Sequence, residues 1–156
     1  MSLSQLSRSI EGSVAIVTGA ASGMGAATAR LFAEQGARVA AIDLNEGPLS
    51  EVVAEIEAAG KEARGWKLDL DDGDAIKTVF DEIGDHFGAM DILVNNAGIS
   101  RFAPIDGDDY EDAWALSLSV LLTAHTRTFR AALPGLRRSA NPRIVNIAST
   151  EGLGAT

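Results

Sequence analysis

The stretch TGAASGMG, residues 18–25, lies between two different kinds of sequence. The run that leads into it, SVAIVTG at 13–19, is apolar and β-branched and predicts a strand. The stretch that follows, MGAATARLFAEQG at 24–36, has helical periodicity, with Leu31 and Phe32 expected on its apolar side. A glycine-rich turn between a strand and a helix begins a β-α unit, and the rest of the chain repeats this alternation.

Further strands are predicted at 37–43, within 62–70, at 90–98 and at 143–149, with helices at 48–60, 71–88 and 108–136 between them. The strands are mostly continuous apolar runs, which is typical of parallel strands buried on both faces. Five strands separated by four helices predict an α/β fold, a Rossmann-type doubly wound parallel sheet with right-handed crossovers. We expect residues 1–12 to form a flexible leader.

Composition excludes several classes of protein. The net charge of −9 argues against nucleic-acid binding, which needs a basic face. There is no apolar run of the length that a membrane span needs, and there are no cysteines for disulfides or thiolate metal sites. The two histidines, His86 and His125, lie on different predicted helices, so no metal site is expected. These features favour a cytoplasmic protein.

The glycine-rich turn predicts a phosphate site. In an open α/β sheet, ligands bind at the carboxyl ends of the strands, near the point where the strand order reverses. The helix after the turn presents free N–H groups and the positive end of its dipole to a pyrophosphate. Gly19 is expected to make the tight turn, and Gly23 and Gly25 to allow close approach and helix packing. The spacing G-x-x-x-G-x-G differs from the common G-x-G-x-x-G fingerprint.

An acidic residue, Asp43, ends the second predicted strand. A carboxylate there accepts hydrogen bonds from the ribose hydroxyls of a dinucleotide and repels a 2′-phosphate. The next residues, Leu44, Asn45 and Glu46, offer no cation to hold such a phosphate. NAD is therefore favoured over NADP. The alternative is that Asp43 only caps a turn.

Four motifs occur in order over residues 13–149. They are T-G-x-x-x-G-x-G at 18–25, Asp69 with Leu70 after the third strand, N-N-A-G at 95–98, and RIVNIAS at 143–149. In this combination the sequence resembles the short-chain dehydrogenase/reductase family. The resemblance implies the strand order 3-2-1-4-5. It also makes residues 13–156 a dinucleotide-binding Rossmann domain, incomplete relative to the family because it ends after the fifth strand.

The resemblance also implies roles for individual residues. Asp69 would contact the adenine amino group, Asn95 would brace the central strands, and Ser149 would hydrogen-bond the substrate oxygen as a catalytic residue. The implied cofactor-binding residues are Thr18, Gly19, Ser22, Gly23, Met24, Gly25, Asp43, Leu44, Asp69, Leu70, Asn95, Ala97 and Gly98.

Two departures from the family stand out. In the family, the general acid/base is a tyrosine, and a lysine four residues later lowers the pKa of that tyrosine. The only tyrosine in this sequence is Tyr110, and a tryptophan stands four residues after it, in Y-E-D-A-W. We therefore interpret Tyr110 as a surface or core anchor. An asparagine that supports a proton-relay water in the family is replaced by Leu121. Ser117 or Ser119 could substitute only if the helix were locally distorted. We therefore expect a fragment, a truncated product or the ordered part of something longer.

Three functions remain open. The first is an NAD-dependent oxidoreductase that transfers hydride between nicotinamide and a small alcohol or carbonyl substrate, as a homo-oligomer (dimer or tetramer). The second is a catalytically inactive NAD-binding fragment or pseudoenzyme. The third is another nucleotide-dependent α/β enzyme, such as a methyltransferase, against which the N-N-A-G and Ser149 motifs argue. The loop 100–107 is the one segment expected to shape a substrate pocket, with Arg101 in solvent.

Overall fold

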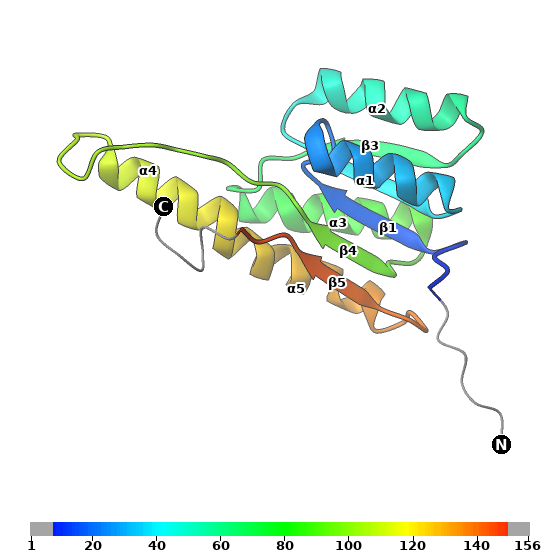
Figure 1. Cartoon of the computed structure of the whole chain (residues 1–156). Coiled ribbons are helices and arrows are strands. Elements are labelled where there is room, and N and C mark those ends of the chain that lie inside the picture. Colours follow the sequence, from blue (N-terminus) through cyan, green and yellow to red (C-terminus); the bar gives the residue numbers. More distant parts are fainter. Residues whose placement is uncertain (1–7, 150–156) are drawn as a thin grey trace.

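Five parallel strands form one sheet in a computed structural model that describes residues 8–149 (Figure 1). The strands are β1 (Val14–Thr18), β2 (Arg38–Asp43), β3 (Ala63–Lys67), β4 (Ile92–Asn95) and β5 (Arg143–Asn146). Their order is β3-β2-β1-β4-β5, with every neighbouring pair parallel, which confirms the predicted topology. The order reverses between β1 and β4, so a ligand site is expected at the carboxyl ends of these strands.

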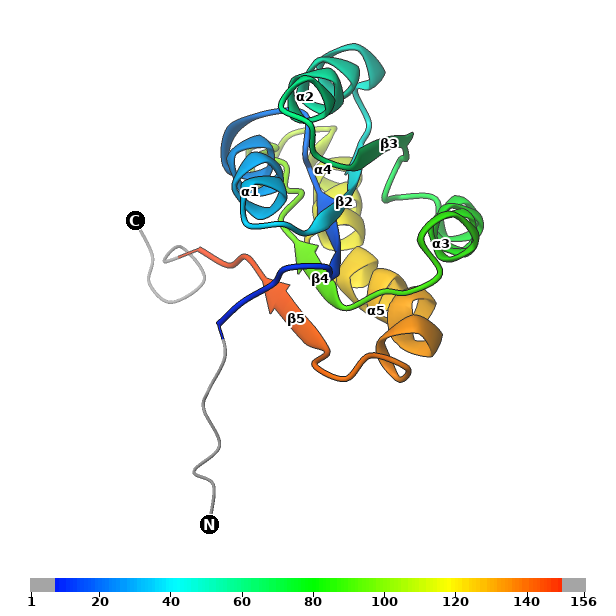
Figure 2. The ribbon, with the colours of Figure 1, turned by 90° about the vertical axis from the view of Figure 1, so that its right-hand side faces the viewer.

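Helices cover both faces of the sheet. They are α1 (Gly23–Glu34), α2 (Glu46–Ala58), α3 (Gly73–Phe87), α4 (Tyr110–Leu118), a π-helical turn η1 (Ser119–Thr123) and α5 (Ala124–Leu136). The view along the sheet shows α1 and α2 on one face and α3 and α5 on the other (Figure 2). The helix α4 and the segment before it extend beyond the sheet (Figure 1).

The central strands divide their side chains between two cores. Along β1, Val14 and Ile16 join the core shared with α3 and α5, whereas Ala15 and Val17 join the core shared with α1 and α2. This alternation follows from the two-residue period of a strand. All five β1 residues are at most 1% exposed, as expected for a strand with a neighbour on each side and helices on both faces.

The helix α1 corrects one prediction. Leu31 was expected on the buried side but is 51% exposed, and α1 instead packs through Gly25, Ala26, Ala29 and Ala33. These small residues share one face of the helix, at spacings of three and four. They let the α1 backbone lie close to the sheet, which a leucine on that face would prevent.

The predicted helix at 108–136 is also corrected. The structure divides it into α4, the π-helical turn η1 and α5, which follow one another without a break. A π-helical turn holds one more residue than an α-helical turn, so it changes which residues face the sheet on either side of it. Such turns occur often at functional sites, and Leu121 lies within this one.

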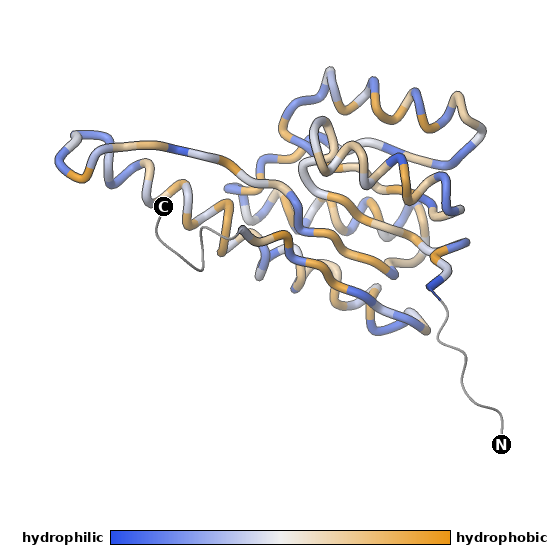
Figure 3. The backbone as a smooth tube through the Cα atoms, in the orientation of Figure 1, coloured by the Kyte–Doolittle hydropathy of each residue, from blue (hydrophilic) through white to orange (hydrophobic). Residues whose placement is uncertain are grey.

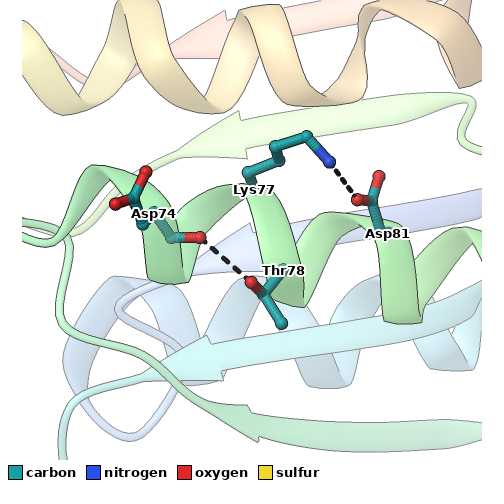
Figure 4. A network of polar contacts seen from close by, with 4 residues as sticks. All are labelled: Asp74, Lys77, Thr78 and Asp81. Atoms are coloured by element: carbon teal, nitrogen blue, oxygen red, sulfur yellow. Dashed lines mark hydrogen bonds and ion pairs between the residues drawn. The ribbon is translucent and has the colours of Figure 1, made fainter.

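The acidic run at 69–74 supplies the N-cap of α3. The Asp72 carboxylate accepts hydrogen bonds from the backbone N–H groups of Asp74 (3.0 Å) and Ala75 (2.9 Å). On the exposed side of α3, Lys77 pairs with Asp81 at 2.5 Å and the Thr78 hydroxyl donates to the Asp74 carbonyl at 3.1 Å (Figure 4). The carboxylate of Asp81 raises the pKa of Lys77 through this hydrogen bond.

The expected leader is described only from residue 8 onward. There its last part is attached to the domain, because Ile10 packs against the α1–α2 core and the Gly12 N–H donates to the Gly36 carbonyl at 2.9 Å. Over residues 8–149, none of the helices combines the length and apolarity needed to cross a bilayer.

Candidate functional site

A cavity of about 460 Å³ opens at the carboxyl ends of β1, β2, β3 and β4. It contains most of the residues that the sequence assigned to cofactor binding: Gly19, Ser22, Gly23, Met24, Asp43, Leu44, Asp69, Leu70, Ala97 and Gly98. Thr18, Gly25 and Asn95 do not line it. Parallel strands place the loops that follow them at one edge of the sheet, which is why residues so far apart in sequence meet here.

The three glycines of the turn have three different structural roles. Gly19 has a φ of 69°, and a Cβ atom there would lie 2.8 Å from the Ala97 Cα. A Cβ on Gly25 would overlap the Gly19 carbonyl oxygen, so this glycine permits α1 to approach the turn. Gly23 lines the cavity, has a φ of 52°, and has nothing within 4 Å of an added Cβ. Its left-handed backbone conformation is one that glycine adopts without strain.

Thr18 and Asn96 hold the turn against β4. The Thr18 hydroxyl accepts hydrogen bonds from the backbone N–H groups of Asn96 and Ala97, both at 3.0 Å. The Asn96 side-chain amide donates to the Thr18 carbonyl at 2.9 Å. The sequence analysis assigned roles to Asn95, Ala97 and Gly98 of the N-N-A-G motif but none to Asn96. The N-N-A-G motif marks Asn96 as a candidate residue. The sequence does not show that its side chain turns toward β1, where it bonds the Thr18 carbonyl.

The amino end of α1 faces the cavity. Ser22 is the N-cap residue in an extended conformation, and its side chain makes no capping hydrogen bond. The backbone N–H of Ala26 donates to the Ser22 carbonyl at 3.1 Å. The N–H groups at the start of a helix have no carbonyl partner within it, and their positive partial charge favours an anion. Ser22, Gly23 and Met24 bring this end of α1 to the cavity wall.

Two carboxylates share the cavity with these donors. Asp43 accepts from the Ala21 N–H (3.0 Å), the Asn45 N–H (2.9 Å) and the Asn45 side-chain amide (3.2 Å). Asp69 accepts from the Asp71 N–H at 3.0 Å. Asn45 also lines the cavity. The sequence analysis mentioned Asn45 only because it carries no positive charge, and did not predict it as a site residue.

Asn95 is buried below the cavity rather than in its wall. Its side-chain amide donates to the Asn146 side-chain oxygen at 2.9 Å, and its own oxygen accepts from the Thr128 hydroxyl at 2.8 Å. These bonds join β4 to β5 and to α5. Asn95 is 2% exposed and has a partner on each end of its amide, so its role in this structure is to connect elements.

The two candidate catalytic positions lie at the margin of this site. Ser149 follows β5, is exposed, and does not line the cavity. Leu121 is 43% exposed, and its side chain lies 3.5 Å from the position of a Cβ on Gly98. The helix is locally distorted at η1, yet the Ser117 hydroxyl donates to the Ala113 carbonyl (2.7 Å) and the Ser119 hydroxyl to the Asp71 carboxylate. Neither serine lines the cavity.

The remaining singled-out residues lie elsewhere. Tyr110 stacks on Trp114 with ring centroids 6.3 Å apart, beside a second cavity of about 80 Å³ that Arg101 also lines. Burial lowers the pKa of the His125 imidazole below its ordinary value. Within residues 8–149, no group of three or more histidine or carboxylate side chains is placed to hold a metal ion.

The chain is similar to known proteins of one family. A family model described as short chain dehydrogenase matches residues 13–155. The chain is 40% identical over 147 residues to a 2,5-dichloro-2,5-cyclohexadiene-1,4-diol dehydrogenase of Sphingobium indicum, covering 94% of this chain and 58% of that protein. It is 36% identical over 140 residues to a D-threitol dehydrogenase of Mycolicibacterium smegmatis, covering 90% and 54%.

A solved structure gives the same result for the fold. The crystal structure of a metagenomic short-chain oxidoreductase in complex with NADP matches with a TM-score of 0.88 and 36% identity, over 95% of this chain and 67% of that one. The chain spans a little more than half the length of the curated relatives that it matches. The match over residues 13–155, the sheet order and the glycine turn together place this chain in the short-chain dehydrogenase/reductase family.

Proposed function

We propose that this chain binds a nicotinamide dinucleotide, NAD in preference to NADP, in the cavity at the carboxyl edge of the sheet. The observation that carries the proposal is that one cavity is lined by the glycine turn, by the start of α1 and by Asp43. The turn leaves open space at Gly23 beside unpartnered helix N–H groups, which fits a pyrophosphate. The Asp43 carboxylate fits the adenosine ribose, and Asp69 with Leu70 the adenine.

The preference for NAD rests on charge. None of the described residues that line the cavity is a lysine or an arginine, whereas two are aspartates. A ribose with a free 2′-hydroxyl can donate a hydrogen bond to Asp43, but a 2′-phosphate would meet a like charge there. The related crystal structure contains NADP, so the direct comparison of the two cofactors is the sharper test.

We further propose that the chain is the cofactor-binding part of an oxidoreductase for a small alcohol or carbonyl substrate. The bound nicotinamide supplies or accepts the hydride. Ala97 and Gly98 lie along the nicotinamide end of the cavity, and Ser149 holds the substrate oxygen. The sequence contains no Y-x-x-x-K, since Tyr110 is followed by Glu111, Asp112, Ala113 and Trp114. A second candidate, a chain that binds NAD without turning over substrate, is favoured by Leu121, which stands where the family has an asparagine.

Calorimetric titration with NADH and NADPH tests the binding proposal. We expect NADH to bind at least about tenfold more tightly, equivalent to about 1.4 kcal/mol, and Asp43→Asn to reduce that ratio. Equal binding of the two cofactors would contradict the NAD preference, and no binding of either would contradict the function. A panel of alcohols with NAD then separates the two candidates, because NADH appears at 340 nm only with turnover.

We also propose that the chain forms a homo-oligomer through α4, η1 and the start of α5. Four large apolar side chains are exposed there, Trp114 at 54%, Leu118 at 40%, Leu121 at 43% and Leu122 at 61%. Exposed apolar residues clustered on one helix favour association. Light scattering coupled to gel filtration should give a mass above 16.2 kDa, and Leu122→Glu should lower it. A single-chain mass for the unmodified protein would contradict the proposal.

A further inference from the structure

The segment after β3 forms one wall of the cavity. Asp69 and Leu70 line the cavity there, at the place that the proposed function assigns to the adenine. Within the segment, the Asp69 carboxylate accepts a hydrogen bond from the Asp71 N–H at 3.0 Å. This bond joins two residues of the same turn, so it sets the local shape of the segment and leaves its position to contacts from other elements.

Two side chains from distant parts of the sequence hold Asp71. Ser119, the first residue of η1, donates a hydrogen bond from its hydroxyl to the Asp71 carboxylate. Arg127, on α5, donates from Nη1 to the Asp71 carbonyl oxygen at 2.9 Å. Both side chains belong to half-buried residues. Asp71 is therefore held at its side chain and at its backbone by donors that only tertiary structure brings to it.

Arg127 also packs along this segment. A Cβ atom on Gly73, the first residue of α3, would lie 3.2 Å from the Arg127 Nε. The helices α3 and α5 pack against each other on one face of the sheet and contribute to the same core (Figure 2). Residues 69–74 include four aspartates, so the guanidinium charge lowers the repulsion among their carboxylates. Arg127 thus contributes a hydrogen bond and a compensating charge to the segment that carries Asp69.

We propose that Ser119 and Arg127 are positioning residues for adenine recognition. They hold Asp71, and through the Asp71 N–H they fix where the Asp69 carboxylate lies at the cavity wall. Neither Ser119 nor Arg127 is among the residues that line the cavity, so both act through Asp71 and not by contact with the base. The inference rests on the proposed function in one respect, that the adenine lies against Asp69.

The chemistry of a carboxylate supplies a specific probe of its position. An ionised carboxylate only accepts hydrogen bonds, and the 6-amino group of adenine donates them. AMP and purine riboside 5′-monophosphate differ only at this point, because the second has hydrogen in place of the amino group. The ratio of their affinities therefore reports the contact between Asp69 and the base, whereas a loss of structure would weaken both probes.

Calorimetric titration should show that the unmodified protein binds AMP about tenfold more tightly than the analogue, and Asp69→Ala should reduce this ratio to about one. Ser119→Ala should reduce it to about threefold, because the segment is freer to move once the Asp71 carboxylate has lost its donor. Arg127→Gln should have a similar effect. Ser119→Thr, which keeps the hydroxyl, should retain the ratio of the unmodified protein. In a chain that already carries Asp69→Ala, adding Ser119→Ala should change nothing further.

Each of the two residues has a matched control on the same helical segment. Ser117 is also half-buried, but its hydroxyl donates to the Ala113 carbonyl at 2.7 Å within α4. Arg130 is exposed on α5, three residues beyond Arg127. Ser117→Ala and Arg130→Gln should both leave the affinity ratio unchanged. Circular dichroism of each variant confirms that it is folded.

The outcomes separate this inference from the proposed function. If the unmodified protein prefers AMP but neither Ser119→Ala nor Arg127→Gln changes the ratio, the positioning role is wrong and the NAD proposal stands. An equal loss in Ser117→Ala would also overturn the positioning role, since a general change in the helix would explain it. Equal binding of AMP and the analogue by a protein that binds NADH would show that Asp69 does not read the base. If the unmodified protein binds neither NADH nor AMP, both proposals fail.

Discussion

The strands β1 and β5 have similar sequences and very different surroundings. Both are short, apolar and β-branched, and Figure 3 marks the middle of each as hydrophobic. Yet Ile16 in β1 is 0% exposed, whereas Ile144 and Val145 in β5 are 41% and 43% exposed. β1 lies between β2 and β4 with helices on both faces, whereas β5 has β4 as its one strand neighbour within residues 8–149. An apolar sequence thus indicates that a strand can be buried, and the strands and helices around it decide how far its side chains are exposed.

The largest expected effect tests that difference directly. Ile16→Ala should lower the free energy of unfolding by about 4 kcal/mol, because it leaves a cavity in a closed core. Ile144→Ala, the same change on the exposed strand, should cost less than about 1 kcal/mol. Urea denaturation of both variants measures the two values. Equal losses would break the comparison and show that β5 is covered in the protein in solution.

The second prediction concerns how tightly the β1 end of the sheet is packed. Gly25→Ala should cost about 3 kcal/mol, because the added Cβ would overlap the Gly19 carbonyl oxygen and neither backbone can move freely. Gly47→Ala is the control, since Gly47 lies in α2 with nothing within 4 Å of the added atom. It should be neutral or stabilising by up to about 1 kcal/mol. A mild effect at Gly25 would contradict the close approach of α1 to the turn.

The third prediction concerns the link between the two regions. Thr128→Val removes the hydroxyl that donates to the buried Asn95 oxygen, and should cost about 2 kcal/mol because that oxygen loses its partner. Thr78→Val is the matched control. Its hydroxyl bonds a helix carbonyl on the exposed side of α3 (Figure 4), where water replaces it, so the expected cost is below about 0.5 kcal/mol. Thermal unfolding of both variants gives the comparison.

The smallest expected effect is a pH dependence from the half-buried His125 of α5. Burial lowers the pKa of His125 in the folded chain, so below pH about 6.5 protons bind preferentially to the unfolded chain. The free energy of unfolding should therefore fall slightly as pH drops from 7.5 to 5.5. In His125→Gln this part of the pH dependence should disappear. An unchanged pH profile in the variant would show that the imidazole is as accessible as in the unfolded chain.

Much of the candidate site was predictable because its residues sit at fixed points in the β-α alternation. Asp43 ends a strand and Gly19, Asp69 and Ala97 each follow one, and parallel strands bring the segments after them to one edge. Asn96 and Asn45 were not predicted as site residues. Their roles depend on which way a side chain turns, toward Thr18 in one case and toward Asp43 in the other, and neighbouring sequence does not specify that.

The sequence by itself determined the fold class and the position of the glycine turn, because periodicity and turn residues are local properties, and its resemblance to a known family supplied the strand order. Tertiary structure decided which apolar residues are buried, since Leu31 and Ile144 are as apolar as residues in the core. It also decided the π-helical turn at Ser119–Thr123, which an apolar helical pattern does not reveal. Tertiary structure also decided the three hydrogen bonds to Asp43, because their donors come from two segments that only folding brings together.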